Sequence, residues 1–237
     1  MRTPLALLAG TSVLLLLTAC GAPATTAEPT ARPTDNPITD VVPTVTPTSE
    51  PIPEPSDDTP GYMWVQDDTK HVAVSVPDTW TDLDGTGYVD DDGINWYLVT
   101  ASTDVKAYYE GWETSGVDVA ATPFTGELTA EDADAGAKDL FVKVDVGFGF
   151  DDRCTKDQVD VPYGDTDNWY KGYLSTWTDC GGTHTAALLM AMYDTKLTHY
   201  IWVSALLVTD QEQDEVAQEI LASYQAKFDD RAYVPRG

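Results

Sequence analysis

The sequence predicts an α+β domain in which helices cover an antiparallel sheet, preceded by an export signal and a disordered linker. Valine-rich segments with alternating apolar residues indicate strands, and capped amphipathic stretches indicate helices. Four of the predicted strands follow one another without an intervening helix. The resulting order, β-β-α-β-α-β-β-β-β-α, is typical of an α+β domain.

Residues 1–19 have the pattern of a lipoprotein signal peptide, with a basic start at Arg2 followed by an apolar run. The run is too short to be a comfortable transmembrane span. It ends in Leu17-Thr18-Ala19-Cys20, which resembles the bacterial lipobox. That resemblance implies a diacylglycerol on the Cys20 thiol and a protein held at the extracytoplasmic face of the cell membrane. The alternative is an ordinary signal peptide in which Cys20 is incidental.

Residues 20–60 are predicted to be a lipidated cysteine followed by a disordered Pro/Thr-rich linker. From residue 21 on, this segment contains ten of the 15 prolines of the chain and nine threonines. Such a composition buries too little apolar surface to offset the entropy of ordering the chain. Extended proline-rich chain of this length reaches on the order of 100 Å.

Residues 61–237 are predicted to form a single extracellular α+β domain, because all seven tryptophans, all 12 tyrosines and all five phenylalanines lie there. This part has 33 acidic and 11 basic residues. Nucleic acid and anionic membrane surfaces would be repelled by that charge, so neither is an expected partner. The acidity indicates either a solubilising surface or a site for cations or for a basic partner.

The predicted elements follow in order along the domain. Strands are expected at 71–77, 94–102, 117–122, 154–161, 168–179, 184–193 and 199–208, and residues 78–93 form an acidic, turn-rich connection. Helices are expected at 103–116, 129–147 and 209–228. The second helix begins with the capping pattern Thr-Ala-Glu-Asp at Thr129. Its end is ambiguous, because apolar residues alternate from Val142 to Phe150; a helix leading into a loop is preferred.

Three cysteines are present, and lipidation uses Cys20. The remaining two, Cys154 and Cys180, are in an exported chain, where a pair of cysteines normally forms a disulfide. Cys154 opens one predicted strand and Cys180 closes the next, so antiparallel pairing brings them together. A loop of this length contributes roughly 3.5 kcal/mol to stability in the chain-entropy picture.

His184 follows Cys180 by four residues, yet a nucleophile–base pair or a zinc pair would require the disulfide to be broken. A Ser-His-Asp triad needs a suitably placed serine, and no G-x-S-x-G motif occurs. His71, His184 and His199 all stand at predicted strand starts without metal-ligand spacing, which favours structural roles. No cofactor, metal or catalytic residue is therefore predicted.

Acidic turns and spaced aromatic residues are weaker leads. Residues 82–93 and 165–168 supply oxygen ligands that calcium prefers, but Gly93 stands where an EF-hand loop needs glutamate. Trp169, Tyr173 and Trp177 recur every four residues, so a regular strand would place them on one face. Such a face serves as a binding platform for sugars or proline-rich peptides, or more commonly as core.

The segments "VAVSVPDTWTDLDG", "CTKD" and "WYKGYLSTWTDCGG", with the closing acidic helix, together resemble a module of actinobacterial secreted proteins. This module occurs on lipoproteins and beside trypsin-like serine protease domains, and it is similar to the PsbP-like α/β/α sandwich. The resemblance implies a non-catalytic extracellular module. The protease domain is absent from this chain, so protease activity does not carry over.

These observations favour a lipid-anchored cell-envelope protein that presents a binding or interaction domain, with an envelope protein or a glycan as its partner. The alternatives are a carboxylate-dependent extracellular hydrolase and a structural or chaperone-like partner of another exported protein. The hydrolase would need two acidic residues within about 10 Å of each other in a cleft.

Overall fold

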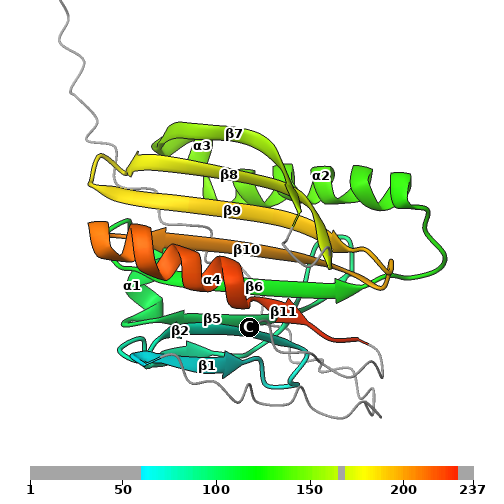
Figure 1. Ribbon diagram of the computed structural model, residues 1–237, viewed down its shortest axis with the longest axis horizontal. Coiled ribbons are helices and arrows are strands. Elements are labelled where there is room, and N and C mark those ends of the chain that lie inside the picture. Colours follow the sequence, from blue (N-terminus) through cyan, green and yellow to red (C-terminus); the bar gives the residue numbers. More distant parts are fainter. Residues whose placement is uncertain (1–59, 165–168, 229–237) are drawn as a thin grey trace, which may run out of the picture. The chain divides into compact units, whose positions relative to one another are not determined.

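The computed structural model describes residues 60–164 and 169–228 of the chain, which form two antiparallel β-sheets with helices against them (Figure 1). The predicted signal peptide and most of the predicted linker lie outside these residues. The α+β class expected from the element order is confirmed, because antiparallel strands dominate and a few helices accompany them.

The larger sheet has the strand order β3-β5-β6-β10-β9-β8-β7, with β4 paired to β5. Its strands are β3 (Asp82–Asp84), β4 (Tyr88–Val89), β5 (Asn95–Ser102), β6 (Gly116–Pro123), β7 (Thr155–Gly164), β8 (Tyr170–Cys180), β9 (Thr185–Asp194) and β10 (His199–Leu207). Every pairing is antiparallel, and the last four strands are consecutive neighbours. The run of four strands predicted between residues 154 and 208 is therefore confirmed.

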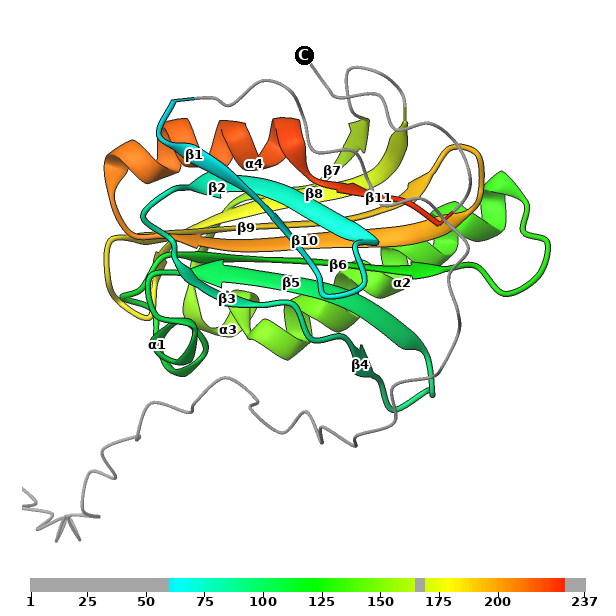
Figure 2. The ribbon, with the colours of Figure 1, turned by 90° about the horizontal axis from the view of Figure 1, so that it is seen from below.

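The smaller sheet has the order β1-β2-β11 and consists of β1 (Tyr62–Gln66), β2 (Val72–Pro77) and β11 (Gln225–Ala226). Only β2 was predicted. The alternation at 71–77 that predicts this strand is typical of a half-buried one, yet its residues Val72 to Val76 are all buried. The prediction was wrong because β2 is the central strand of the small sheet, paired with β1 and β11, and it also contacts the large sheet and α4 (Figure 2). A strand buried on both faces needs no polar alternation.

The helices divide between the two faces of the large sheet (Figure 2). Helices α1 (Val105–Glu110), α2 (Ala130–Phe148) and α3 (Phe150–Arg153) lie on one side, here named the α2 face. The other side, the α4 face, carries the small sheet, the π-helical turn η1 (Glu212–Val216) and α4 (Ala217–Ser223). The sheet is thus covered on both faces.

Helix α2 begins as predicted and ends later. Thr129 caps it, because its hydroxyl accepts from the Asp132 amide and the Asp132 carboxylate accepts from the Thr129 amide. The helix then continues to Phe148 and is followed by α3, whereas a loop was preferred there. The helix preferred over the alternating pattern is thus confirmed, and Val142 and Val146 are 54% and 76% exposed on the solvent side of the helix.

The two other predicted helices are shorter than expected. Helix α1 stops at Gly111 instead of residue 116, and β6 begins directly at Gly116, where a Cβ would collide with the ring of Tyr108. The last helix stops at Ser223 instead of residue 228. Its following residues leave the helix to pair with β2, Gln225 opposite Ala73 and Ala226 opposite Val72. Tertiary pairing overrides helix propensity here.

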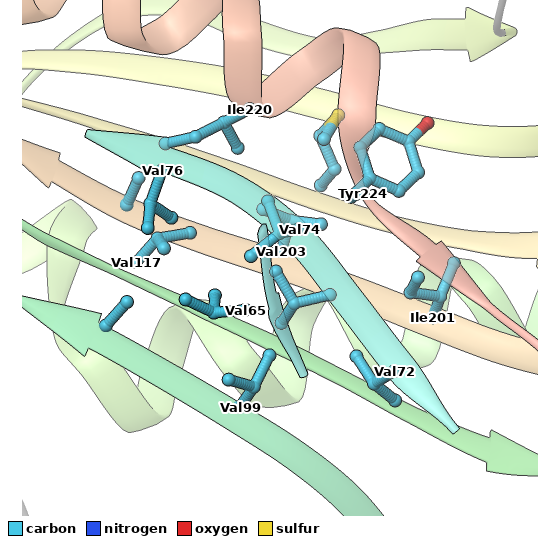
Figure 3. Close-up of a cluster of buried hydrophobic side chains, with 14 of the residues drawn as sticks. Val65, Val72, Val74, Val76, Val99, Val117, Ile201, Val203, Ile220 and Tyr224 are labelled. Atoms are coloured by element: carbon cyan, nitrogen blue, oxygen red, sulfur yellow. The ribbon is translucent and has the colours of Figure 1, made fainter. Parts of the chain in front are cut away.

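The two faces carry separate cores. On the α4 face, valines of the small sheet meet side chains of the large sheet beneath α4, including Val74, Val203 and Ile220 (Figure 3). On the α2 face, Trp177, Leu189 and Phe150 are fully buried under the helices. Strand β10 contributes side chains to both cores. Ile201 and Val203 face the core of the α4 face, and Trp202 faces the core of the α2 face.

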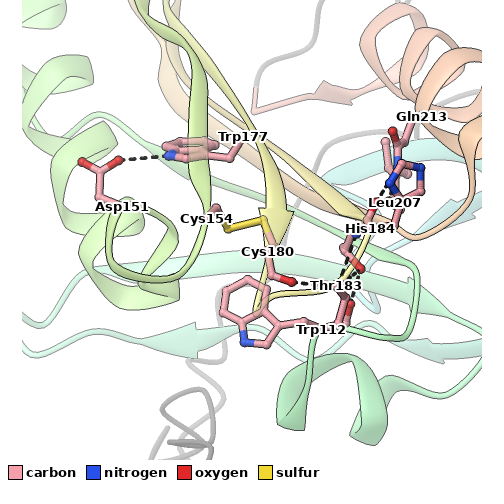
Figure 4. The surroundings of a disulfide bond; sticks show 10 residues. Trp112, Asp151, Cys154, Trp177, Cys180, Thr183, His184, Leu207 and Gln213 are labelled. Carbon is pink, nitrogen blue, oxygen red and sulfur yellow. Dashed lines mark hydrogen bonds between the residues drawn. A yellow bond between two sulfur atoms is a disulfide. The ribbon is translucent and has the colours of Figure 1, made fainter.

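The predicted disulfide between Cys154 and Cys180 is present (Figure 4). Cys154 directly precedes β7 and Cys180 closes β8, so the bond joins the open ends of this antiparallel hairpin. Nearby, the indole N–H of Trp177 donates to Asp151 at 2.9 Å and ties α3 to β8. The bond accounts for both cysteines of the described part of the chain.

Candidate functional site

The predicted lipid-attachment residue, Cys20, lies outside the described residues, as does the acidic segment at 165–168. Among the residues that the structure describes, no helix is long and apolar enough to cross a membrane. In the same residues, no group of three or more His, Cys, Asp or Glu side chains is arranged to hold a metal ion. The acidic residues at 82–93, considered above as a calcium site, therefore do not form such a group in the described structure.

A cavity of about 550 Å³ lies on the α2 face, between helix α2 and the sheet. Its wall is built from β4 and the turn after it, from β5, β6 and β10, and from α1 and α2. These segments come from separate parts of the sequence, and the folded sheet brings them together around the cavity. Its volume is that of a typical small-molecule site.

Aromatic side chains form much of the cavity wall. They are Tyr88, Trp96, Tyr109, Phe148, Tyr200 and Trp202. The rings of Tyr88 and Trp96 are nearly parallel, with centroids 6.3 Å apart, and Phe148 meets Trp202 edge to face at 6.0 Å. Such mutual packing holds the rings in place, so the wall is preformed.

Helix α2 comes close to the sheet at Gly136, a glycine of the cavity wall. A Cβ added there would lie 1.9 Å from the hydroxyl oxygen of Tyr200. The glycine therefore makes room for the end of the Tyr200 side chain, which packs against Phe124 at the other side. Burial, together with the nearby charges of Asp132 and Asp139, raises the pKa of Tyr200.

Asp118 is a buried carboxylate of the cavity wall, only 1% exposed. It accepts hydrogen bonds from the hydroxyls of Thr100 and Tyr109, each at 2.7 Å, and of Tyr108 at 3.0 Å. Burial first, and then the charge of Asp118, raises the pKa of Tyr109, so this hydroxyl stays a donor. These three hydroxyl hydrogen bonds replace much of the hydration that the Asp118 carboxylate loses when it is buried.

Asp90 organises the turn between β4 and β5 at the cavity mouth. One of its carboxylate oxygens accepts from the amides of Asp92 and Ile94, and the other accepts from the indole N–H of Trp96 at 3.0 Å. The cavity also has one basic residue, Lys143, whose ammonium lies 2.6 Å from the Asp92 carboxylate. The acidic connection predicted at 78–93 is thus part of the wall.

Trp202 is 5% exposed and its indole N–H is buried without a hydrogen-bond partner among residues 60–164 and 169–228. Burial and the charge of Asp90 raise the pKa of Tyr88, while the neighbouring Trp202 opposes the rise, which places the indole near the Tyr88 hydroxyl. That proximity falls short of hydrogen-bond geometry. A buried donor without an acceptor lowers the stability of the fold by about 1–3 kcal/mol.

The histidines are separate from this cavity. His184 is exposed, and its Nε2 lies 2.5 Å from Asp210 (Figure 4 shows its position near Gln213). It precedes β9, which starts at Thr185, and the hydrogen bond to Asp210 is the main cause that raises its pKa. No serine hydroxyl is bonded to it in the described residues. The arrangement is that of a surface ion pair.

His71 and His199 are buried at the other end of the sheets. His71 Nδ1 is 2.8 Å from the Thr69 hydroxyl, and His199 Nδ1 is 2.8 Å from the Thr198 hydroxyl. Both imidazoles pack against Phe228, with ring centroids 5.2 Å apart in each case. Burial is the main reason that the pKa of His71 is lowered. These contacts tie the end of the described chain to the two sheets.

The aromatic residues spaced along β8 serve as core, which was the use preferred over a binding platform. Tyr173 and Trp177 pack in the core of the α2 face, whereas Trp169 precedes β8 and packs against the core of the α4 face. The prediction of one shared face was wrong because a spacing of four is in phase only inside a regular strand, and β8 starts after Trp169.

Two carboxylates lie together at the end of α2, away from the cavity wall. Asp145 is 8% exposed, and burial followed by the charge of Asp151 raises its pKa to about 6. The pKa of Asp151 is lowered instead, although burial alone would raise it, because Trp177 and Lys156 stabilise its charge. Such a pair holds one proton in the range where a single aspartate would already be ionised.

Sequence reasoning missed the cavity, although it named the acidic segment beside it. Trp96 and Trp202 lie in segments correctly predicted as strands, yet alternation alone does not reveal which strands become neighbours. Comparison of the chain with protein-family models, with curated proteins and with solved structures gives no match.

Proposed function

We propose that this protein is a lipid-anchored binding protein of the cell envelope, in which residues 61–237 form a PsbP-like binding domain. The anchor is the lipid on Cys20, at the outer face of the cell membrane. Support for the anchor comes from the lipobox pattern, and support for the domain comes from a sheet covered on both faces. An envelope protein or a glycan remains the expected partner of the exposed surface.

The cavity on the α2 face is the observation that supports binding. It combines preformed aromatic walls with a buried indole N–H on Trp202 that has no acceptor in the described protein. Pockets of this kind, largely apolar with a few polar groups, are typical of small-molecule sites.

The binding function is tested by purifying the lipoprotein from its own membranes and analysing it by native mass spectrometry. We expect the wild type to carry a bound small molecule. Val144→Phe should lose it, because Val144 lines the cavity and the larger ring fills the space. Val142→Phe is the matched control, since Val142 is on the same helix and 54% exposed. Equal occupancy in the two variants, or none in the wild type, would contradict the proposal.

The anchor is tested by feeding cells an alkyne analogue of palmitate and detecting the label on the protein. We expect labelling of the wild type and none of Cys20→Ala, which should also appear in the medium. Label that persists in Cys20→Ala would place the acyl chain elsewhere. Crosslinking on intact cells, with a chain lacking residues 61–237 as the reference, then identifies any envelope protein or glycan that contacts the domain.

A second candidate function is a carboxylate-dependent hydrolase, which the pair of Asp145 and Asp151 favours. One carboxyl group with a raised pKa beside one with a lowered pKa is the division that acid–base hydrolysis requires. Neither residue lines the cavity described above. Turnover of chromogenic glycosides or esters that is lost in both Asp145→Asn and Asp151→Asn would support the hydrolase. Turnover unchanged in both variants would exclude the pair as its catalytic centre.

A further inference from the structure

The charges on the cavity wall are strongly one-sided. Five aspartates line it, and Lys143 is the one basic residue among the lining residues. The aspartates are Asp90, Asp91, Asp92, Asp118 and Asp139. The Lys143 ammonium is already 2.6 Å from Asp92, so it offers little attraction to a bound anion. The whole chain has a formal net charge of −27, which reinforces the local field. A negatively charged ligand would be repelled at this site.

The aromatic rings of the wall also favour a cationic ligand. The face of an aromatic ring is negative, and a cation within about 6 Å of the centroid is attracted to it. Indole gives the strongest interaction, and two of the rings in this wall are indoles, Trp96 and Trp202. Tyr88 lies parallel to Trp96 at 6.3 Å, and Phe148 is edge to face with Trp202. The cavity wall thus combines aromatic rings, two of them indoles, with carboxylates.

Trp202 belongs to the wall through its ring and not through its N–H. The indole nitrogen is buried, and the Tyr88 hydroxyl lies near it. A ligand in the cavity therefore meets the ring of Trp202, which favours a group that interacts with aromatic rings.

We propose that the cavity binds an organic cation: an alkylated ammonium group held among the aromatic rings and the carboxylates of the wall. This inference rests on the proposed binding function and names the chemical class of the ligand. The carboxylates draw the cation in and the rings select an alkylated ammonium over a small hydrated ion.

The test uses choline as the probe and dimethylbutanol, its uncharged carbon isostere, as the matched control ligand. Both have the same shape and the same hydroxyl acceptor, so they differ only in charge. Binding to isotopically labelled protein is followed by the indole N–H signal of Trp202, identified by its absence in Trp202→Phe. We expect choline to move this signal and to bind about tenfold more tightly than dimethylbutanol, a difference of about 1.4 kcal/mol.

Variants then separate the contribution of the charge from that of the indole ring. Asp139→Asn removes a charge from the cavity wall and should weaken choline about two- to threefold, with the effect reduced at high salt. Asp152→Asn, an exposed residue of α3 that does not line the cavity, should leave the affinity unchanged. Trp202→Phe replaces an indole of the cavity wall with a ring that attracts cations less strongly, and it should weaken choline binding while the spectrum of the remaining tryptophans stays that of the folded protein.

Three results would overturn the inference. Dimethylbutanol could bind as tightly as choline, choline could leave the Trp202 signal unmoved at concentrations far above its expected affinity, or Asp139→Asn and Asp152→Asn could behave alike. The mass-spectrometric test of the binding function is separate from this one. A neutral or anionic molecule found there in the wild type would refute the cationic class and leave the binding function standing.

Discussion

At the scale of single residues, the α2 face contains polar groups that a core would normally exclude. Asp118 is buried and receives three hydroxyl hydrogen bonds, whereas the Trp202 N–H receives no acceptor from the described protein. The contrast indicates different roles. Asp118 is built into the fold by donors from α1 and β5, whereas the Trp202 N–H lies near the Tyr88 hydroxyl without meeting hydrogen-bond geometry.

Asp145 makes a pH-dependent contribution whose sign follows from its raised pKa of about 6, against an ordinary value of 3.8. The folded state prefers its protonated form, so its contribution is complete below pH 3.8 and is lost as the pH rises through 6. We expect Asp145→Asn to unfold at higher urea than the wild type at pH 7, by on the order of 1 kcal/mol after allowance for solvent screening.

The comparison is made by urea unfolding between acidic and neutral pH, with Asp152→Asn as the control for removing an acidic charge. The difference between variant and wild type is the useful quantity, because Asp151 has a lowered pKa and acts in the opposite direction. If the free energy of unfolding of the wild type and of Asp145→Asn varied in parallel with pH, Asp145 would have the same pKa in the folded and unfolded states.

Gly147 provides a stability prediction on the same helix. It lies inside α2, and a Cβ added there would meet no atom within 4 Å. Alanine loses less backbone entropy than glycine on forming a helix, so Gly147→Ala should raise the free energy of unfolding by about 0.5 kcal/mol. Gly136→Ala should lack this gain, because its Cβ would press on the Tyr200 hydroxyl. Equal gains in the two variants would contradict the close approach at Gly136.

At the scale of elements, the β7–β8 hairpin depends on more than its strand pairing. Its register shifts between Lys156 and Gln158 and again before Val161, and β7 is the edge of the large sheet. Irregular edge strands pair weakly. The disulfide holds this hairpin at its open end, and the hydrogen bond from Trp177 to Asp151 holds the adjoining helix.

Replacing both cysteines, Cys154→Ala with Cys180→Ala, should lower the free energy of unfolding by about 3 kcal/mol. The physical reason is that the bond spans a separation of 26 residues and restricts the unfolded chain. Equilibrium unfolding of the double variant and of the oxidised wild type measures the difference. Reduced wild type is the control and should match the variant. A double variant as stable as the oxidised protein would mean that the constraint on the unfolded state is offset in the folded one.

At the scale of the whole molecule, the two cores have different functions. The core of the α4 face is formed by apolar side chains of the small sheet, the large sheet and α4 (Figure 3). The α2 face is packed around Phe150 and Trp177 at one end and contains the cavity near Trp96 and Trp202. One face of the sheet thus provides a continuous apolar core, and the other combines a core with the cavity.

A chain of residues 61–237 alone should unfold cooperatively with the same midpoint as the full-length protein, because the elements described here lie within that range. Thermal unfolding by circular dichroism measures this. A shorter chain of residues 71–237 serves as the contrast: it lacks β1, which pairs with β2 and buries Val65, and should lose several degrees in midpoint. A lower midpoint for residues 61–237 would show that the preceding segment contributes to folding.

Local patterns in the sequence were sufficient for the strands β2, β5, β6, β8, β9 and β10, for the start of α2 at its capping box, and for the Cys154–Cys180 bond. The strands follow from the spacing of apolar residues, the helix start from its cap, and the disulfide from the number of cysteines. All of these can be read directly from the sequence. The tertiary structure decided that β1 and β11 join β2, that the last helix ends at Ser223, and that Tyr88, Trp96 and Trp202 meet around a cavity. These features depend on which distant segments become neighbours, and alternation within a strand does not encode that choice.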